Sequence, residues 1–190
     1  MLTNRIIGAF TFRRGVYAEV EKDTSFTTAA WILVAVVAFL NRLGSFGSAS
    51  DWLIGAIVGT IFAILGFAAG ALVINWMGRT VFSANVSFDE LIRTLGLAYV
   101  WQVVGILGIL AAFSEALSFV LAPVQIIGWL LMVIAWLLAA KEALDLAWVQ
   151  AIVTVVLGGL GQFVITTVIA ALALGLLELV GAALGEIFGY

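Results

Sequence analysis

Few side chains in this sequence can carry out acid–base, nucleophilic or metal chemistry. The chain contains neither cysteine nor histidine. The missing cysteines exclude disulfides, thiolate nucleophiles, iron–sulfur clusters and zinc–thiolate sites. The missing histidines remove the commonest general base and metal ligand, and the usual axial ligand of haem. We therefore expect no catalytic residue, no bound metal and no cofactor.

Three residues remain as weak candidates for a polar contact inside long apolar segments. Gln102 and Gln162 lie at similar depths in two of these segments, and each amide needs a partner because it costs free energy in hydrocarbon. Either the two glutamines hydrogen-bond to each other, or they line a site for a translocated solute. Arg93 lies near the start of its segment. It extends to the membrane surface, binds an anionic head group, or pairs with Asp89 or Glu90.

Five apolar stretches must position these residues. Each has about the 20 residues that a helix needs to cross a bilayer core of about 30 Å. Hydrophobic residues make up 65% of the chain and charged residues 10%, against about 25% charged in a soluble domain. The sequence predicts an all-α integral membrane protein whose five-transmembrane-helix bundle occupies residues 26–190. The stretches cover residues 26–44, 52–77, 91–113, 117–140 and 148–177.

Residues 1–25 form the only sizeable polar region. Apolar residues recur in it at helical spacing between charged ones, which predicts one or two short amphipathic helices in the cytoplasmic interface, broken near Gly15. This segment either attaches to anionic lipid or a partner, or caps the bundle. The first apolar stretch is too long for a cleaved signal sequence, so we interpret it as an uncleaved anchor.

The basic residues predict an orientation. With five alternating spans, seven of the eight Lys and Arg residues fall on one side and only Arg42 on the other. Short loops rich in Lys and Arg stay in the cytoplasm. We therefore expect a cytoplasmic N-terminus and an external C-terminus, in the plasma (inner) membrane if the protein is prokaryotic.

Small residues in the second stretch indicate a helix-packing surface. Gly55, Gly59, Gly66 and Gly70 form two pairs spaced four residues apart. Such pairs let another helix backbone approach closely, either within the bundle or in a dimer.

Two further signals concern helix starts. Ser87 and Glu90 have the spacing of a capping box ahead of the third stretch. Pro123 is expected in the first turns of the fourth stretch, where its missing N–H is tolerated.

Two segments show similarity to a known family. These are GRTVFSANVSFDELIRTLGLA at residues 78–98 and GVYAEVEKD at residues 15–23. The chain resembles the Ypt-interacting-protein (Yip) domain family over essentially its whole length, specifically the prokaryotic Yip-one-like members. The resemblance implies a five-span fold with a cytoplasmic N-terminus, and no particular biochemical activity.

We expect a non-enzymatic scaffold or accessory subunit that packs against lipid and against other membrane-protein subunits or its own copies. Nucleic acid is not an expected partner. The alternative is a small transporter or channel component with a polar path near Gln102 and Gln162. An enzyme is disfavoured because the acidic residues lie in loops or near helix ends, without a base, nucleophile or metal-ligand set.

Overall fold

The computed structural model describes residues 2–45, 52–111 and 114–188, apart from the side chains of residues 170, 173–174 and 176–188. Every regular element in these ranges is a helix. The elements in order are α1 (Leu2–Phe10), α2 (Val16–Lys22), α3 (Phe26–Leu43), α4 (Trp52–Val81), α5 (Phe88–Ala98), the 3₁₀-helix η1 (Tyr99–Leu107), α6 (Gly108–Ala111), α7 (Glu115–Leu144) and α8 (Trp148–Phe188).

Five helical segments in the described residues are long and apolar enough to cross a membrane. This confirms the predicted all-helical architecture and the number of candidate spans. They are Phe26–Leu43, Trp52–Val81, Phe88–Ala111, Glu115–Leu144 and Trp148–Ile169.

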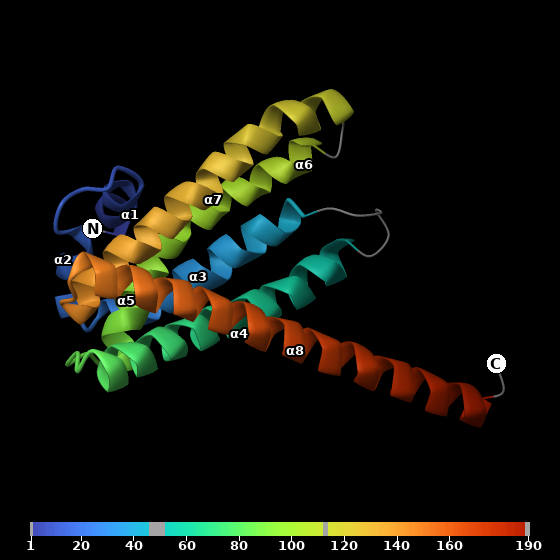
Figure 1. The fold of residues 1–190 in the computed structure, drawn as a ribbon. Helices are drawn as coiled ribbons and strands as arrows, with labels where there is room; N and C mark the ends of the chain where they lie inside the picture. Colours follow the sequence, from blue (N-terminus) through green and yellow to red (C-terminus); the bar gives the residue numbers. More distant parts are fainter. Residues whose placement is uncertain (1, 46–51, 112–113, 189–190) are drawn as a thin grey trace.

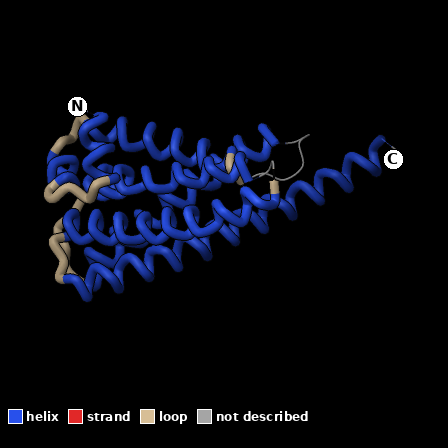
Figure 2. The backbone as a smooth tube through the Cα atoms, turned by 90° about the horizontal axis from the view of Figure 1, so that it is seen from above, coloured by secondary structure: helices blue, strands red, loops and turns tan. Residues whose placement is uncertain are grey.

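The helices converge at one end and separate at the other (Figure 1). Helix α3 lies between η1 and α4, α7 packs on the other side of η1, and α8 packs on α4. We call the converging end the polar end; it carries α1, α2 and the connections at residues 82–87 and 145–147. At the opposite, open end, the α6–α7 pair diverges from the α4–α8 pair (Figure 1). The far part of α8 extends beyond the other helices (Figure 2).

Aromatic rings fill the core near the polar end. Phe67 of α4 is fully buried. Its ring meets those of Trp31, Tyr99 and Trp136 edge-on, at centroid distances of 5.6, 5.4 and 6.0 Å. Edge-to-face pairs at this spacing are favourable beyond the area that they bury. One phenylalanine thus ties α4 to α3, η1 and α7.

The third span is not one continuous α-helix. The capping box is present: Ser87 Oγ accepts from the Glu90 N–H at 3.2 Å, and Glu90 Oε2 accepts from the Ser87 N–H at 2.7 Å. The α-helix then changes at Tyr99 into a 3₁₀-helix of 9 residues, although such runs seldom exceed about 4 residues. Within this run the Asn41 side chain donates to the Gln102 carbonyl at 2.7 Å. The hydropathy of the third span cannot reveal this contact, because the donor belongs to another helix.

The last two helices are longer than the apolar stretches that predicted them. Helix α7 begins at Glu115, after an extended Ser114. Pro123 is therefore in the interior of the helix, which corrects the prediction that it lies in the first turns, where its missing N–H is tolerated. Its missing N–H leaves the carbonyl of Phe119 without its helical donor. Helix α8 has 41 residues and joins the fifth span to the C-terminal segment, a length of about 61 Å at 1.5 Å per residue.

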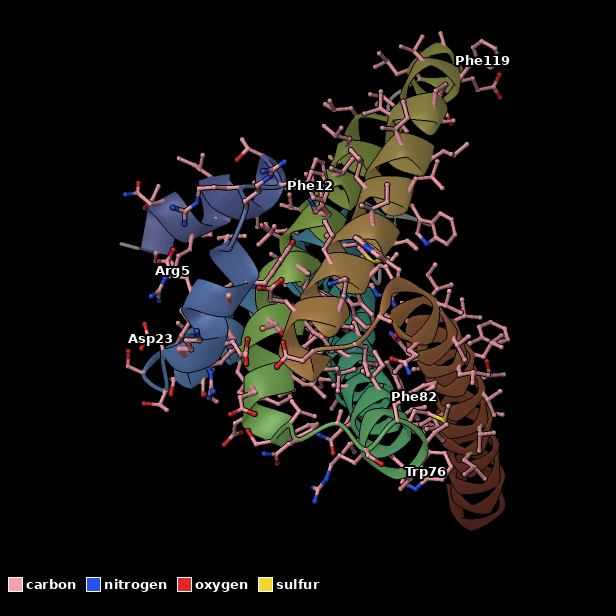
Figure 3. The ribbon with its side chains drawn as sticks, turned by 60° about the vertical axis from the view of Figure 1, so that its left-hand side comes forward. Arg5, Phe12, Asp23, Trp76, Phe82 and Phe119 are labelled. Atoms are coloured by element: carbon pink, nitrogen blue, oxygen red, sulfur yellow. The ribbon has the colours of Figure 1, made fainter. Side chains whose placement is uncertain are left out.

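The N-terminal region forms two helices separated at Gly15, as predicted, and Gly15 adopts a left-handed φ of 75°. Val16, Tyr17 and Val20 of α2 are buried, and α2 lies against α5 and α7. Ion pairs tie α1 to this layer. Arg5 reaches Glu19 at 3.1 Å and Asp23 at 2.7 Å, and Figure 3 shows Arg5 beside the Asp23 turn.

Acidification should loosen α1 from α2. Hydrogen bonds from Arg5 lower the pKa of Glu19, and hydrogen bonds from Ser25 and then Arg5 lower the pKa of Asp23. A carboxylate with a lowered pKa adds stability above its unfolded pKa, and that stability is lost as the pH falls through the folded value. Amide-exchange protection factors in α1 should therefore drop below about pH 4.

The matched control for this titration is Arg5→Gln, which should lower the protection of α1 at pH 7 and flatten its pH dependence. Amides in α4 serve as the internal reference. Protection of α1 that is equal at pH 7 and pH 3 in the unaltered chain would contradict the role of these ion pairs.

Candidate functional site

Arg93 is buried at the polar end and holds the N-terminal region on the bundle. Only 4% of the residue is exposed. Its Nε and Nη2 donate to the Glu21 carbonyl at 2.9 and 2.5 Å, and its Nη1 donates to Thr27 Oγ1 at 3.1 Å. A cation at a helix C-terminus satisfies free carbonyls and complements the helix dipole. The guanidinium therefore caps α2 from the first turns of the third span.

The surroundings of Arg93 differ from those expected from the sequence. Among the described residues no carboxylate forms an ion pair with it, so Asp89 and Glu90 are not its partners. Arg93 contacts the backbone carbonyl of Glu21. The Glu21 side chain has a raised pKa, because of burial and then the negative charges of Asp145 and Glu90. These contacts give Arg93 a structural role, because it connects α5 to α2.

Gly66 and Gly70 of α4 lie directly against α8. A Cβ on Gly66 would come within 2.6 Å of Thr166 Cγ2, and a Cβ on Gly70 within 2.9 Å of Gln162 Oε1. Gly161 makes the reciprocal contact from α8, since its Cβ would meet Val73 Cγ2 at 2.9 Å. Side chains of each helix thus fill spaces left by glycines of the other.

The other two glycines of the second span do not share this contact. A Cβ on Gly59 would approach Arg42 Cδ of α3 at 3.0 Å. Gly55 is exposed and has no described atom within 4 Å of its Cβ position. The four glycines share one face of α4. They do not form a single contact, because their neighbours change along the helix: α8 at Gly66 and Gly70, Arg42 of α3 at Gly59, and no described atom at Gly55.

The two glutamines predicted to interact have different neighbours. Gln162 lies on the glycines of α4, whereas Gln102 lines a pocket between α3, η1 and α7. No hydrogen bond joins the two residues in the part of the chain that is described. The pocket has a volume of about 310 Å³ and is lined by Asn41, Gly44, Ser45, Trp101, Gln102, Val104, Gly105, Gln125, Gly128, Trp129 and Met132.

One wall of the pocket is an unusually close approach of two backbones. A Cβ on Gly44 would overlap the Gly105 carbonyl, and a Cβ on Gly108 would overlap the Gly44 carbonyl. A Cβ on Gly105 would overlap the Asn41 side chain. These positions require glycine because the obstructing atoms are backbone or a hydrogen-bonded amide. Sequence reasoning missed this contact, since Gly44 lies far along the chain from Gly105 and Gly108.

Asn41 and Gln125 were also missed, and their only signal was an amide inside or at the end of an apolar stretch. The structure brings both together with Gln102. No titratable side chain lines the pocket, and the described residues contain no group of three or more acids that could hold a metal. The arrangement can hydrogen-bond an uncharged group, but its lining residues do not supply acid–base or metal chemistry.

Replacing Gly66 with Leu should destabilise the α4–α8 contact, because the larger side chain collides with Thr166 and holds the backbones apart. Gly55→Leu is the matched control, with the same change on the same helix where the Cβ meets no described atom. We expect a lower thermal midpoint in detergent for Gly66→Leu than for Gly55→Leu. Equal midpoints would show that α8 does not depend on this contact.

Comparisons with known proteins add no relative. The chain matches no protein-family model. No curated protein and no solved structure is significantly similar to it. The function of the chain must therefore be inferred from its residues and their geometry.

Proposed function

We propose that this chain is a non-enzymatic, multipass membrane protein that acts as a scaffold or accessory subunit. It packs laterally against lipid and against other membrane-protein subunits or its own copies. The observation that carries the proposal is the apolar surface that the chain leaves uncovered. In the most apolar 18-residue stretches of α7 and α8, only 6% and 17% of the residues are buried inside the molecule.

The divergence of the helices adds to this surface. Most large apolar side chains of α7 are exposed, and α8 separates from α4 towards the open end (Figure 1). In a bilayer, lipid tails or helices of another subunit must cover these exposed surfaces. The exposed large apolar residues of α7 are Leu117, Phe119, Val120, Val124, Ile126, Ile127, Trp129, Leu130, Val133 and Ile134.

The proposed orientation has a cytoplasmic N-terminus and an external C-terminus, in the plasma (inner) membrane if the protein is prokaryotic. Its support is the distribution of the eight basic residues. Four of them lie in the N-terminal region, within residues 5–22, and three more lie on α4, α5 and α7 near the polar-end connections. Only Arg42 lies near the open end, in the last turn of α3. The positive-inside rule assigns the polar end to the cytoplasm.

Single cysteines at Ser83 and Ser114 test this orientation, since the chain has no cysteine of its own. Both residues are exposed and lie outside helices at opposite ends of the bundle. In intact cells, a membrane-impermeant maleimide should label Ser114→Cys, and should label Ser83→Cys only after lysis. The reverse pattern would invert the orientation, and labelling of both in intact cells would contradict the five-span topology.

Membership of the Yip domain family is part of the proposal. Its support is the resemblance of residues 78–98, which form the end of α4, the polar-end connection and α5. In this segment Ser87 and Glu90 start the third span and Arg93 holds α2. The motif thus consists of residues that place the N-terminal region on the bundle, which suits a structural role.

The second candidate function is a transporter or channel component, and the amide-lined pocket favours it. Gln102 lies in that pocket with Asn41 and Gln125. Gln162 does not join it, because it lies between α8 and α4. A path through both glutamines therefore has no support, and the pocket by itself has the form of a binding site.

Photo-crosslinking tests the scaffold proposal. A benzophenone amino acid replaces Ile127 on α7 or Phe163 on α8, both exposed in the spans, and Leu2 on α1 is the control outside them. In native membranes the span positions should give a product of one defined mass, either a dimer or a second membrane protein, and Leu2 should not. A chain that is monomeric in native lipid discs and crosslinks only to lipid would contradict the proposal.

A further inference from the structure

We propose that the pocket between α3, η1 and α7 binds the uncharged, hydroxyl-bearing head group of a membrane lipid, such as a monoglycosyl diacylglycerol. This inference does not depend on the scaffold proposal. It starts from the polar atoms that the pocket brings together. Asn41, Gln102 and Gln125 contribute three side-chain amides, and Ser45 contributes a hydroxyl at one edge.

These amides have hydrogen-bonding capacity left over. The Asn41 Nδ2 donates to the Gln102 carbonyl, which leaves the Asn41 Oδ1 free to accept. The side chains of Gln102 and Gln125 form no hydrogen bond with any described residue. An amide without a partner in an apolar surrounding is unfavourable. An occupant with both donors and acceptors removes that cost, and hydroxyl groups provide both.

The lining and the volume of the pocket favour an uncharged group about the size of a sugar ring. Its lining contains no Lys, Arg, Asp or Glu, so an anionic or cationic head group would lie there without a counter-charge. Its volume of about 310 Å³ is far above the roughly 30 Å³ share of one water and is within the range of small-molecule sites. Trp129 also lines the pocket, and its indole adds an apolar ring with one N–H donor.

The location favours a lipid over a solute from water. Helix α3 has 18 residues, about 27 Å at helical rise. Asn41 and Gly44 lie at its far end, whereas Gln125 and Gly128 lie near the middle of the 30-residue α7. The pocket therefore lies where α3 ends and α7 continues past it. On α7, Trp129 shares an exposed apolar face with Ile126, Leu130 and Val133, at helical spacings of three and four residues. Acyl chains of a lipid held in the pocket have this face to run along.

Equilibrium binding of radiolabelled monoglucosyl diacylglycerol to the purified full chain in detergent tests the proposal. Gln102→Leu and Gln125→Leu should each weaken binding about tenfold, since each loses hydrogen bonds to the head group. Gln150→Leu is the matched control, because this glutamine lies at the start of α8 and only accepts from the exposed Ala147 N–H. Trp129→Leu, at an exposed position, should also weaken binding, and it remains available if a glutamine variant does not fold.

Competition with unlabelled compounds distinguishes a lipid ligand from a soluble one. Unlabelled glycolipid should displace the label, whereas phosphatidylglycerol and free methyl glucoside should not at equal concentration. Failure of the glycolipid to bind, unchanged affinity in Gln102→Leu, Gln125→Leu and Trp129→Leu, or equal displacement by phosphatidylglycerol would overturn the proposal. Displacement by methyl glucoside as effective as by the lipid would overturn the lipid assignment and favour a site for a soluble solute.

Discussion

Hydrocarbon offers no hydrogen-bond partner to a peptide group, and the rest of this structure follows from that constraint. Each long apolar segment must satisfy its own N–H and C=O groups, so each becomes a helix. Where a span departs from α-geometry, another group must compensate. At η1 the Asn41 side chain donates to the Gln102 carbonyl. The same requirement explains why the polar connections and the two amphipathic helices gather at one end, and why the spans expose little besides apolar side chains.

Side-chain volume then decides which helices touch. Lipid tails are as apolar as leucine, so association depends on close packing and not on removal of apolar surface from water. The tightest contacts depend on glycine: Gly44 meets Gly105 and Gly108, and Gly66 and Gly70 receive side chains of α8. The first contact joins the end of α3 to η1 and α6, and the second joins α4 to α8. The α6–α7 pair is held apart from the second contact and diverges from the α4–α8 pair at the open end (Figure 1).

The polar end is fixed by different chemistry. Arg93 donates three hydrogen bonds to Glu21 and Thr27, and Arg5 pairs with Glu19 and Asp23 across α1 and α2. The aromatic cluster around Phe67 lies beneath this layer. An anchored polar end and a diverging open end leave the outer parts of α7 and α8 available to lipid or another subunit, which is the basis of the proposed scaffold role. The amide pocket lies at the inner edge of the opening, between α3 and α7.

The sequence by itself determined that the chain is helical, how many of its segments are long and apolar enough to cross a membrane, where the basic residues lie and that the third of these segments starts after Ser87. These features depend on local composition and on neighbours three or four residues apart, which a single sequence displays. Only the tertiary structure decided the 3₁₀ segment, the interior position of Pro123, the partners of Arg93 and the pocket around Gln102. Gln102 illustrates the reason. Its polarity inside an apolar stretch indicates that it needs a partner, but which of the other amides lies beside it depends on how glycines far apart in the chain let α3 approach η1.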